Sequence, residues 1–238
     1  MLRNLISLDD LIFFLLRLPC VLIAISIHES AHGLAAEKMG DPTARLCGRI
    51  TMNPLKHFDL WGTLCLVFFG FGWANPVPIN ARNFKEPKKG MALSALAGPV
   101  SNLLLALIGV LLYRITLKIF LLTGVIVAEG ASLYFTITGF RRTLANVFLN
   151  FESIFISLNV GYAVFNMIPC PPLDGSRIFL FFLPEETYFK IMRYERYIMI
   201  AFFAVLYLGL LDKPLSIACG GVEIALDWLV DRIPFLRI

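Results

Sequence analysis

Long apolar runs separated by short polar segments dominate the chain. Apolar residues are nearly continuous from about Leu18 to Met39, Met91 to Leu112, Val147 to Ile168 and Tyr197 to Leu211. An α-helix needs about 20 such residues to cross a bilayer. The pattern therefore predicts an all-α membrane protein, a polytopic bundle of about four to six transmembrane helices. A last helix is expected from Leu215 to Leu229.

Proline and glycine mark the expected ends of these helices. Pro19 suits a first helical turn, so we expect a short helix before the first span. Gly40 and Pro42 should end that span. The glycine-rich apolar stretch 60–73 is too short for a comfortable crossing and predicts a small re-entrant loop or β-hairpin between the first two core helices. Residues 123–142 are expected to form a loop or an interfacial helix.

Composition supports a membrane protein. Hydrophobic residues make up 58% of the 238 residues and charged residues only 16%, whereas soluble domains are about 25% charged. We expect one integral membrane domain over 1–238, with a core at about 12–185 and C-terminal helices at about 193–230. Two acids in MLRNLISLDD argue against a cleaved signal peptide. The net charge of +4 comes from basic clusters between apolar runs, which argues against nucleic acid as a partner.

The first span carries an H-E-x-x-H motif, formed by His28, Glu29 and His32. Residues four apart on a helix face the same side, so both imidazoles can reach one metal ion. Glu29 lies about 100° around the helix and can reach a water molecule at that ion. Burying three ionisable groups in hydrocarbon costs several kcal/mol unless they have a partner. This pattern is typical of a zinc ligand pair with a general base.

A zinc site needs a third protein ligand. The five scattered cysteines form no C-x-x-C pair and do not suggest a thiolate site or a disulfide framework. Position 38 is lysine, which excludes the extended three-histidine motif. Asp174, in a proline-rich break after the third span, is the better candidate than His57, which we interpret as a surface histidine. An aspartate in such a turn is also a common turn or cap residue.

Three segments, ISIHESAHG, ALAGPVSN and NMIPCPPLDG, occur in an order and spacing that resemble the site-2 protease family of intramembrane zinc metalloproteases. The resemblance covers about residues 12–185. The segments RITMNPLKHFDLWGT and FGFGWANPVPIN are similar to a minimal, core-only branch of that family. The resemblance implies one Zn²⁺ per chain bound by His28, His32 and Asp174, with Glu29 as the catalytic acid/base. It also implies regulated intramembrane proteolysis of transmembrane-helix protein substrates within or near the lipid bilayer.

Two asparagines are further candidates. Asn102 is a candidate donor to the oxyanion or to the substrate backbone, and a helix-packing or capping role is the alternative. Asn166 is a weaker candidate for orienting a ligand or substrate, and the alternative role is a hydrogen bond between helices.

Alternating crossings would place 14 of the 21 basic residues, including the C-terminal tail, on one side. That side is expected to be cytosolic, with the active site opening toward it, in a multi-pass protein of the cell membrane. Competing hypotheses are a metal-binding membrane transporter and a scaffold that binds membrane partners without cleaving them.

Overall fold

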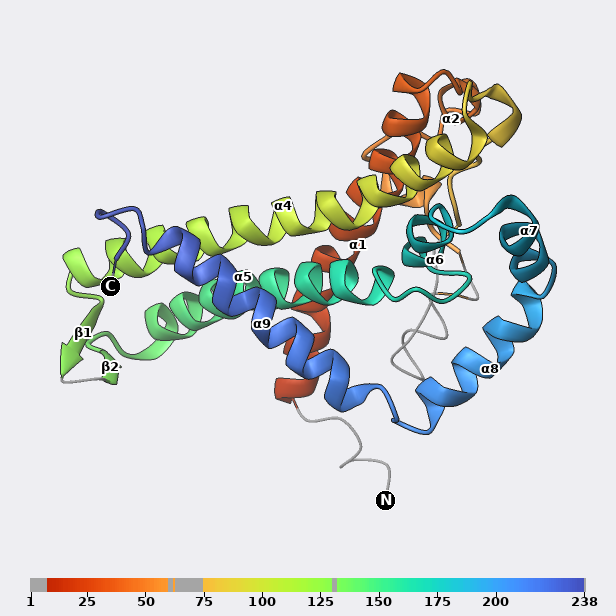
Figure 1. Ribbon diagram of the computed structural model, residues 1–238. Coiled ribbons are helices and arrows are strands. Elements are labelled where there is room, and N and C mark those ends of the chain that lie inside the picture. Colours follow the sequence, from red (N-terminus) through yellow and green to blue (C-terminus); the bar gives the residue numbers. More distant parts are fainter. Residues whose placement is uncertain (1–7, 60–61, 63–74, 130–131, 238) are drawn as a thin grey trace.

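The computed structural model describes residues 8–59, 62, 75–129 and 132–237 (Figure 1). The helices are α1 (Leu8–Lys38), α2 (Thr43–Leu46), α4 (Pro87–Leu122), α5 (Gly139–Asn166), α6 (Asp174–Leu180), α7 (Glu185–Arg193), α8 (Glu195–Tyr207) and α9 (Asp212–Val230). Two 3-10 turns, η1 (Pro54–Lys56) and η2 (Ala81–Asn83), lie between α2 and α4. The all-α prediction is confirmed.

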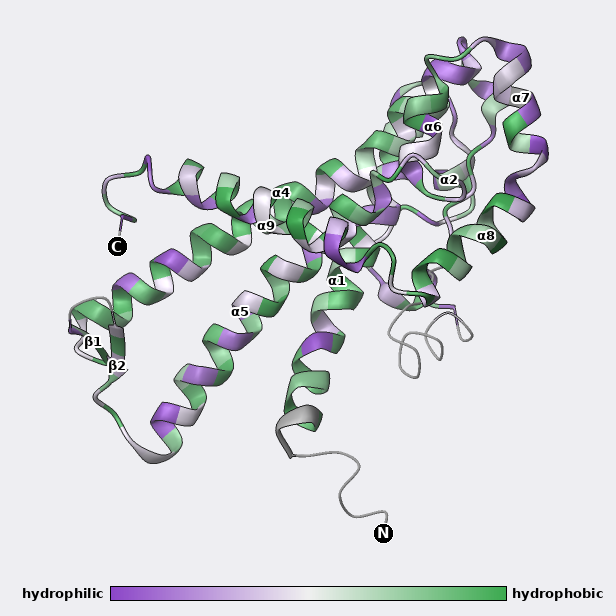
Figure 2. Ribbon diagram, turned by 60° about the horizontal axis from the view of Figure 1, so that its bottom comes forward, coloured by the Kyte–Doolittle hydropathy of each residue, from purple (hydrophilic) through white to green (hydrophobic). Residues whose placement is uncertain are grey.

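Three of these helices are long and apolar enough to cross a membrane, namely α1, α4 and α5. The pair α8 and α9 makes a fourth candidate if it is taken as one broken span, bent by 86°. The count of described spans is therefore three or four, at the lower end of the prediction. Figure 2 shows apolar residues over most of these helices and hydrophilic residues gathered around α2 and α7.

Pro19 does not break the first helix. The prediction of a separate short helix before it is wrong, because α1 continues from Leu8 through Pro19 to Lys38. Proline is tolerated inside membrane helices, where neighbouring helices compensate for the lost hydrogen bond, and α4 contains Pro99 in the same way. The predicted end of α1 is confirmed, since Gly40 has a φ of 109° that a helix cannot continue.

The connection between α4 and α5 contains a β-hairpin, where we expected a loop or an interfacial helix. Strands β1 (Ile126–Glu129) and β2 (Ser132–Phe135) pair antiparallel. Their β-branched and aromatic residues favour strands over a helix. The hairpin predicted at 60–73 lies outside the described residues, apart from Gly62.

The helix α9 packs along α4 and α5. A buried apolar cluster joins the three helices through Ala106, Val110, Val160, Leu226 and Val230. Arg114 on α4 also pairs with Asp227 (2.8 Å) and Asp231 (3.4 Å) at the far end of α9. The C-terminal end of α9 therefore lies at the hairpin end of the bundle (Figure 1). If α8 and α9 form one broken crossing, the tail lies opposite segment 37–93, whereas the prediction of a shared side counted them as two crossings.

Candidate metal site

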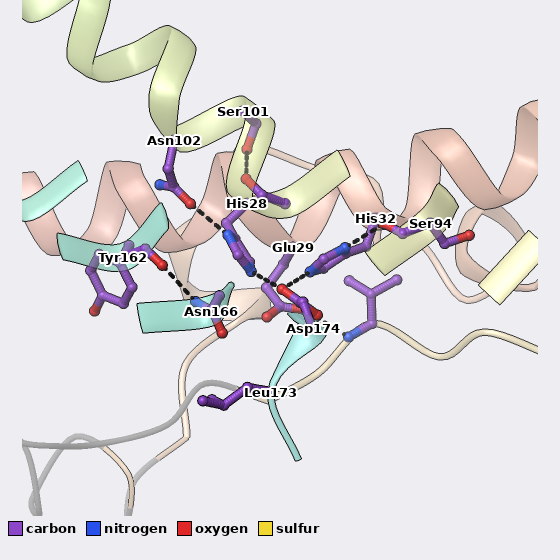
Figure 3. A network of polar contacts seen from close by, with 12 residues as sticks. His28, Glu29, His32, Ser94, Ser101, Asn102, Tyr162, Asn166, Leu173 and Asp174 are labelled. Carbon is purple, nitrogen blue, oxygen red and sulfur yellow. Dashed lines mark hydrogen bonds and ion pairs between the residues drawn. The ribbon is translucent and has the colours of Figure 1, made fainter. Parts of the chain in front are cut away.

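The three predicted metal ligands meet at one point. The Nε2 atoms of His28 and His32 lie 3.2 and 3.3 Å from Oδ2 of Asp174. Their ligand atoms all lie within 4.8 Å of one another. Figure 3 shows the two imidazoles of α1 facing the carboxylate at the start of α6, with Glu29 beside them. His32 and Asp174, which are 142 residues apart in sequence, thus belong to one site.

Hydrogen bonds to the outer ring nitrogens fix both imidazoles. Nδ1 of His32 donates to the carbonyl oxygen of Ser94 (2.7 Å), and Nδ1 of His28 donates to Oδ1 of Asn102 (2.5 Å). With Nδ1 carrying the proton, each neutral ring directs the lone pair of Nε2 toward Asp174. This is the arrangement that outer partners impose on metal-binding histidines.

The donor set fits a zinc ion. Ligand atoms at about 2.0–2.2 Å from a tetrahedral ion lie about 3.3–3.6 Å from one another. The distances of 3.2 and 3.3 Å from the two Nε2 atoms to Oδ2 are close to this range. Oδ2 of Asp174 is buried and has no hydrogen-bond donor among the described residues. Two lone pairs and a carboxylate oxygen would repel one another, and a cation among them removes that repulsion.

Two glycines make this approach of segments possible. A Cβ atom at Gly98 would lie 2.6 Å from Cε1 of His28 and would also overlap the ring of His32. A Cβ atom at Gly175 would lie 2.5 Å from the carbonyl oxygen of Ile168. Gly98 thus allows α4 to pack closely against α1, and its nearest neighbours are the two imidazoles themselves.

Asn102 takes part in a buried chain of side chains. It is fully buried, and its Nδ2 donates to Oδ1 of Asn159 (2.9 Å) and to the carbonyl oxygen of Ala24 (3.4 Å). Nδ2 of Asn159 donates in turn to the carbonyl oxygen of Phe155 (2.8 Å). The predicted role as an oxyanion donor would require this amide to leave both of its partners. The alternative packing role matches these contacts directly.

The remaining candidates lie differently from expectation. Nδ2 of Asn166 donates to the carbonyl oxygen of Tyr162 in its own helix, rather than to another helix. The prediction of a surface histidine at position 57 is wrong: His57 is only 1% exposed, and its Nε2 lies 3.0 Å from the carbonyl oxygen of Thr51. The supporting contacts of Ser94 with His32 and of Asn159 with Asn102 were not predicted from the sequence. Ser94 acts through its backbone, which no side-chain pattern reveals.

Replacing Asn102 by leucine should lower zinc affinity by about 10- to 100-fold, because Nδ1–H of His28 loses its acceptor while every ligand remains. Competition with a chromophoric chelator measures this affinity. Ser101→Ala is the matched control, since the Ser101 hydroxyl donates to Gly98 in its own helix and to no other described residue. Equal affinities for both variants would contradict the role of Asn102 in holding the imidazole.

Comparisons with known proteins agree with this geometry. The model of "Peptidase family M50" matches residues 17–210. The chain is also 40% identical over 182 residues to "Putative zinc metalloprotease YwhC" of Bacillus subtilis (strain 168), which covers 76% of this chain and 75% of that protein. No solved structure matches the chain. The matched region includes the H-E-x-x-H helix and Asp174, and we conclude that the chain belongs to peptidase family M50, the site-2 protease family of zinc metalloproteases.

Proposed function

We propose that this protein hydrolyses peptide bonds of transmembrane-helix substrates within or near the bilayer, as in regulated intramembrane proteolysis. The observation that carries the proposal is the meeting of His28 and His32, on the membrane-spanning helix α1, with Asp174 at the start of α6. A protease whose metal ligands belong to a spanning helix acts most directly on chains that share its membrane.

In this proposal His28, His32 and Asp174 hold one zinc ion, and Glu29 is the acid/base. A zinc ion held there would lower the pKa of an attacking water and would polarise the scissile carbonyl. Glu29 takes the proton of that water and later gives it to the leaving amine. Nδ1–H bonds of the two histidines keep Nε2 available as a ligand atom throughout. Asn102 as a donor to the oxyanion remains a prediction.

The depth of the site suits access from an aqueous side. His32 precedes Lys38 by six residues, which is about 9 Å of helix. The segments that build the site, the end of α1, the start of α4 and α6, all adjoin the connections 39–86 and 167–194. Counted without the C-terminal tail, the connections and helix ends on the site's side carry 12 of the 21 basic residues. We therefore propose that the site opens toward the cytosol in a protein of the cell membrane.

Two other functions use the same metal site without cleavage. A transporter needs ionisable groups spaced along a pathway, yet the described residues contain one group of three metal-binding side chains, His28, His32 and Asp174. A scaffold needs no general base, but Glu29 is present beside the imidazoles (Figure 3). Both features favour the protease.

One reconstitution separates the three functions. The purified protein is placed in lipid vesicles with one equivalent of zinc and a single-span test protein. The proposal predicts fragments cut within or beside the span, and their loss on treatment with 1,10-phenanthroline. Zinc flux without fragments would establish the transporter, and capture of the intact test protein without fragments would establish the scaffold.

A further inference from the structure

The carboxylate of Glu29 accepts a hydrogen bond from a residue outside the metal site. Its Oε2 accepts a hydrogen bond from the backbone N–H of Val77 (2.9 Å). Val77 lies between Pro76 and Pro78, which have no N–H to donate. The side chain of Val77 is buried against α1, where a Cβ at Gly33 would meet its Cγ1 at 3.3 Å. The contact places one carboxylate oxygen of Glu29 against a backbone donor and leaves the other oxygen for a substrate or water proton.

Hydrogen bonds hold the segment 75–80, which carries Val77, at its first residue, Asn75. The N–H of Asn75 donates to the carbonyl oxygen of buried His57 (2.9 Å). Nη2 of Arg49 donates to the carbonyl oxygen of Asn75 (2.5 Å). These bonds tie the start of the segment to the connection that follows α2.

Asp41 holds Asn80, the last residue of the segment, by a hydrogen bond. Its Oδ2 accepts from the N–H of Asn80 (2.7 Å). Its Oδ1 accepts from the N–H of Thr43 (3.1 Å), from the Thr43 hydroxyl and from Nδ2 of Asn83 (2.7 Å). Asp41 is fully buried, three residues after the end of α1, the helix that carries Glu29. One carboxylate therefore connects the end of the catalytic helix to the segment that holds the catalytic side chain.

The charge state of Asp41 suits this task. Burial by itself raises the pKa of the carboxyl group, but hydrogen bonds from Thr43, Asn83 and Asn80 outweigh burial and hold the pKa below its usual value. Asp41 is thus ionised at neutral pH and can accept at both oxygens. Hydrogen bonds to an ionised acceptor are stronger than those between neutral groups.

We propose that Asp41 is a positioning residue for Glu29 and acts through segment 75–80, whose Val77 amide holds the carboxylate. The inference rests on the proposed function, because it assigns Glu29 the role of acid/base. A general base must lie within hydrogen-bond reach of the proton it takes. A base displaced by about 1 Å can lose about 100-fold in rate.

Asp41→Asn tests the connection selectively. The new amide has one oxygen and one NH₂ group, and it satisfies most donors when its oxygen takes the place of Oδ1. The NH₂ group then faces the N–H of Asn80, so the end of the segment is released. We expect kcat for cleavage of a single-span test protein to fall roughly 10- to 100-fold, with KM and zinc content unchanged and faster hydrogen exchange at the Val77 amide. Asn83→Ala removes a donor to Oδ1 and to the Thr43 hydroxyl but leaves the contact of Oδ2 with Asn80. It is the matched control and should retain kcat within about twofold.

A proline pair tests the contact itself. Val77→Pro removes the N–H that Glu29 accepts, whereas Ile79→Pro removes an N–H that makes no hydrogen bond among the described residues. Val77→Pro should lower kcat as Asp41→Asn does, and the double variant should lose no more than either alone. Ile79→Pro should keep the wild-type rate.

Two results would overturn the inference. One is a wild-type kcat for zinc-loaded Val77→Pro. The other is an Asp41→Asn protein whose Val77 amide exchanges as slowly as in the wild type. Failure of the proposed function looks different: the zinc-loaded wild type then cuts no test protein, while exchange at Val77 still responds to Asp41→Asn.

Discussion

Replacement of Glu29 by glutamine should reduce cleavage of a transmembrane substrate by about 10²- to 10⁴-fold, the usual contribution of a general acid–base group. Glutamine keeps the size of the side chain and can still accept the Val77 hydrogen bond, but it cannot take a proton. His28, His32 and Asp174 are unchanged, so the zinc content should stay at one ion per chain. Fragment yield at matched protein and zinc concentrations measures the effect.

A matched control lies on the same helix. Glu37 is eight residues further along α1, and its carboxylate pairs with Arg45 away from the imidazoles. Glu37→Gln should cleave at close to the wild-type rate. Comparable rates for Glu29→Gln and the wild type would exclude Glu29 as the acid/base and would leave the scaffold or the transporter as the better account.

The second large effect is expected at Gly98. Gly98→Ala adds a methyl group that would overlap the rings of both His28 and His32. Neither ring can withdraw freely, because one is bonded to Asn102 and the other to the Ser94 backbone. We expect zinc affinity to fall by about 100-fold or more. This is the upper end of the loss seen when metal-binding side chains lose their hydrogen-bond partners. Cleavage should fall with zinc occupancy.

Gly161→Ala is the control for this change. Gly161 also lies inside a spanning helix, but a Cβ atom there would meet nothing within 4 Å. Thermal unfolding of the zinc-free proteins separates a site defect from a folding defect. Zinc-free Gly98→Ala should still unfold in one cooperative transition, with a stability lowered by the overpacking cost of about 1–3 kcal/mol. Wild-type zinc affinity in Gly98→Ala would mean that the helices are not packed as described.

Hydrophobic patterning predicted the spanning helices well and their ends less well. The runs at 91–112 and 147–168 correspond to α4 and α5, but α4 extends from Pro87 to Leu122. Pro87 suits the first helical position, so α4 begins before the apolar run does. The hairpin β1–β2 was missed because two strands of four residues each give a weak alternation. The turn between α8 and α9 depends on packing against α4 and α5, which is not visible in local sequence.

Motif spacing predicted which side chains meet at the metal site, and packing explains the rest of it. His28 and His32 follow from helical geometry, whereas the contact with Asp174 depends on Gly175 lying against the end of α5. The supporting contacts of Ser94 and Val77 are made by backbone atoms, so residue type carries no signal for them. His57 has charged neighbours in sequence, which suggested a surface position. Its ring is instead buried beside the carbonyl oxygen of Thr51, and its own carbonyl oxygen accepts from the N–H of Asn75.

The most direct measurement of the central claim is X-ray absorption at the zinc edge of the purified, membrane-extracted protein. We predict one zinc per chain with two imidazole nitrogens at about 2.0–2.1 Å and a carboxylate oxygen at about 2.0–2.2 Å. His32→Ala should remove one imidazole from this shell or release the metal. A first shell containing sulfur at about 2.3 Å, or one that is unchanged in Asp174→Ala, would place the ion elsewhere and contradict the account.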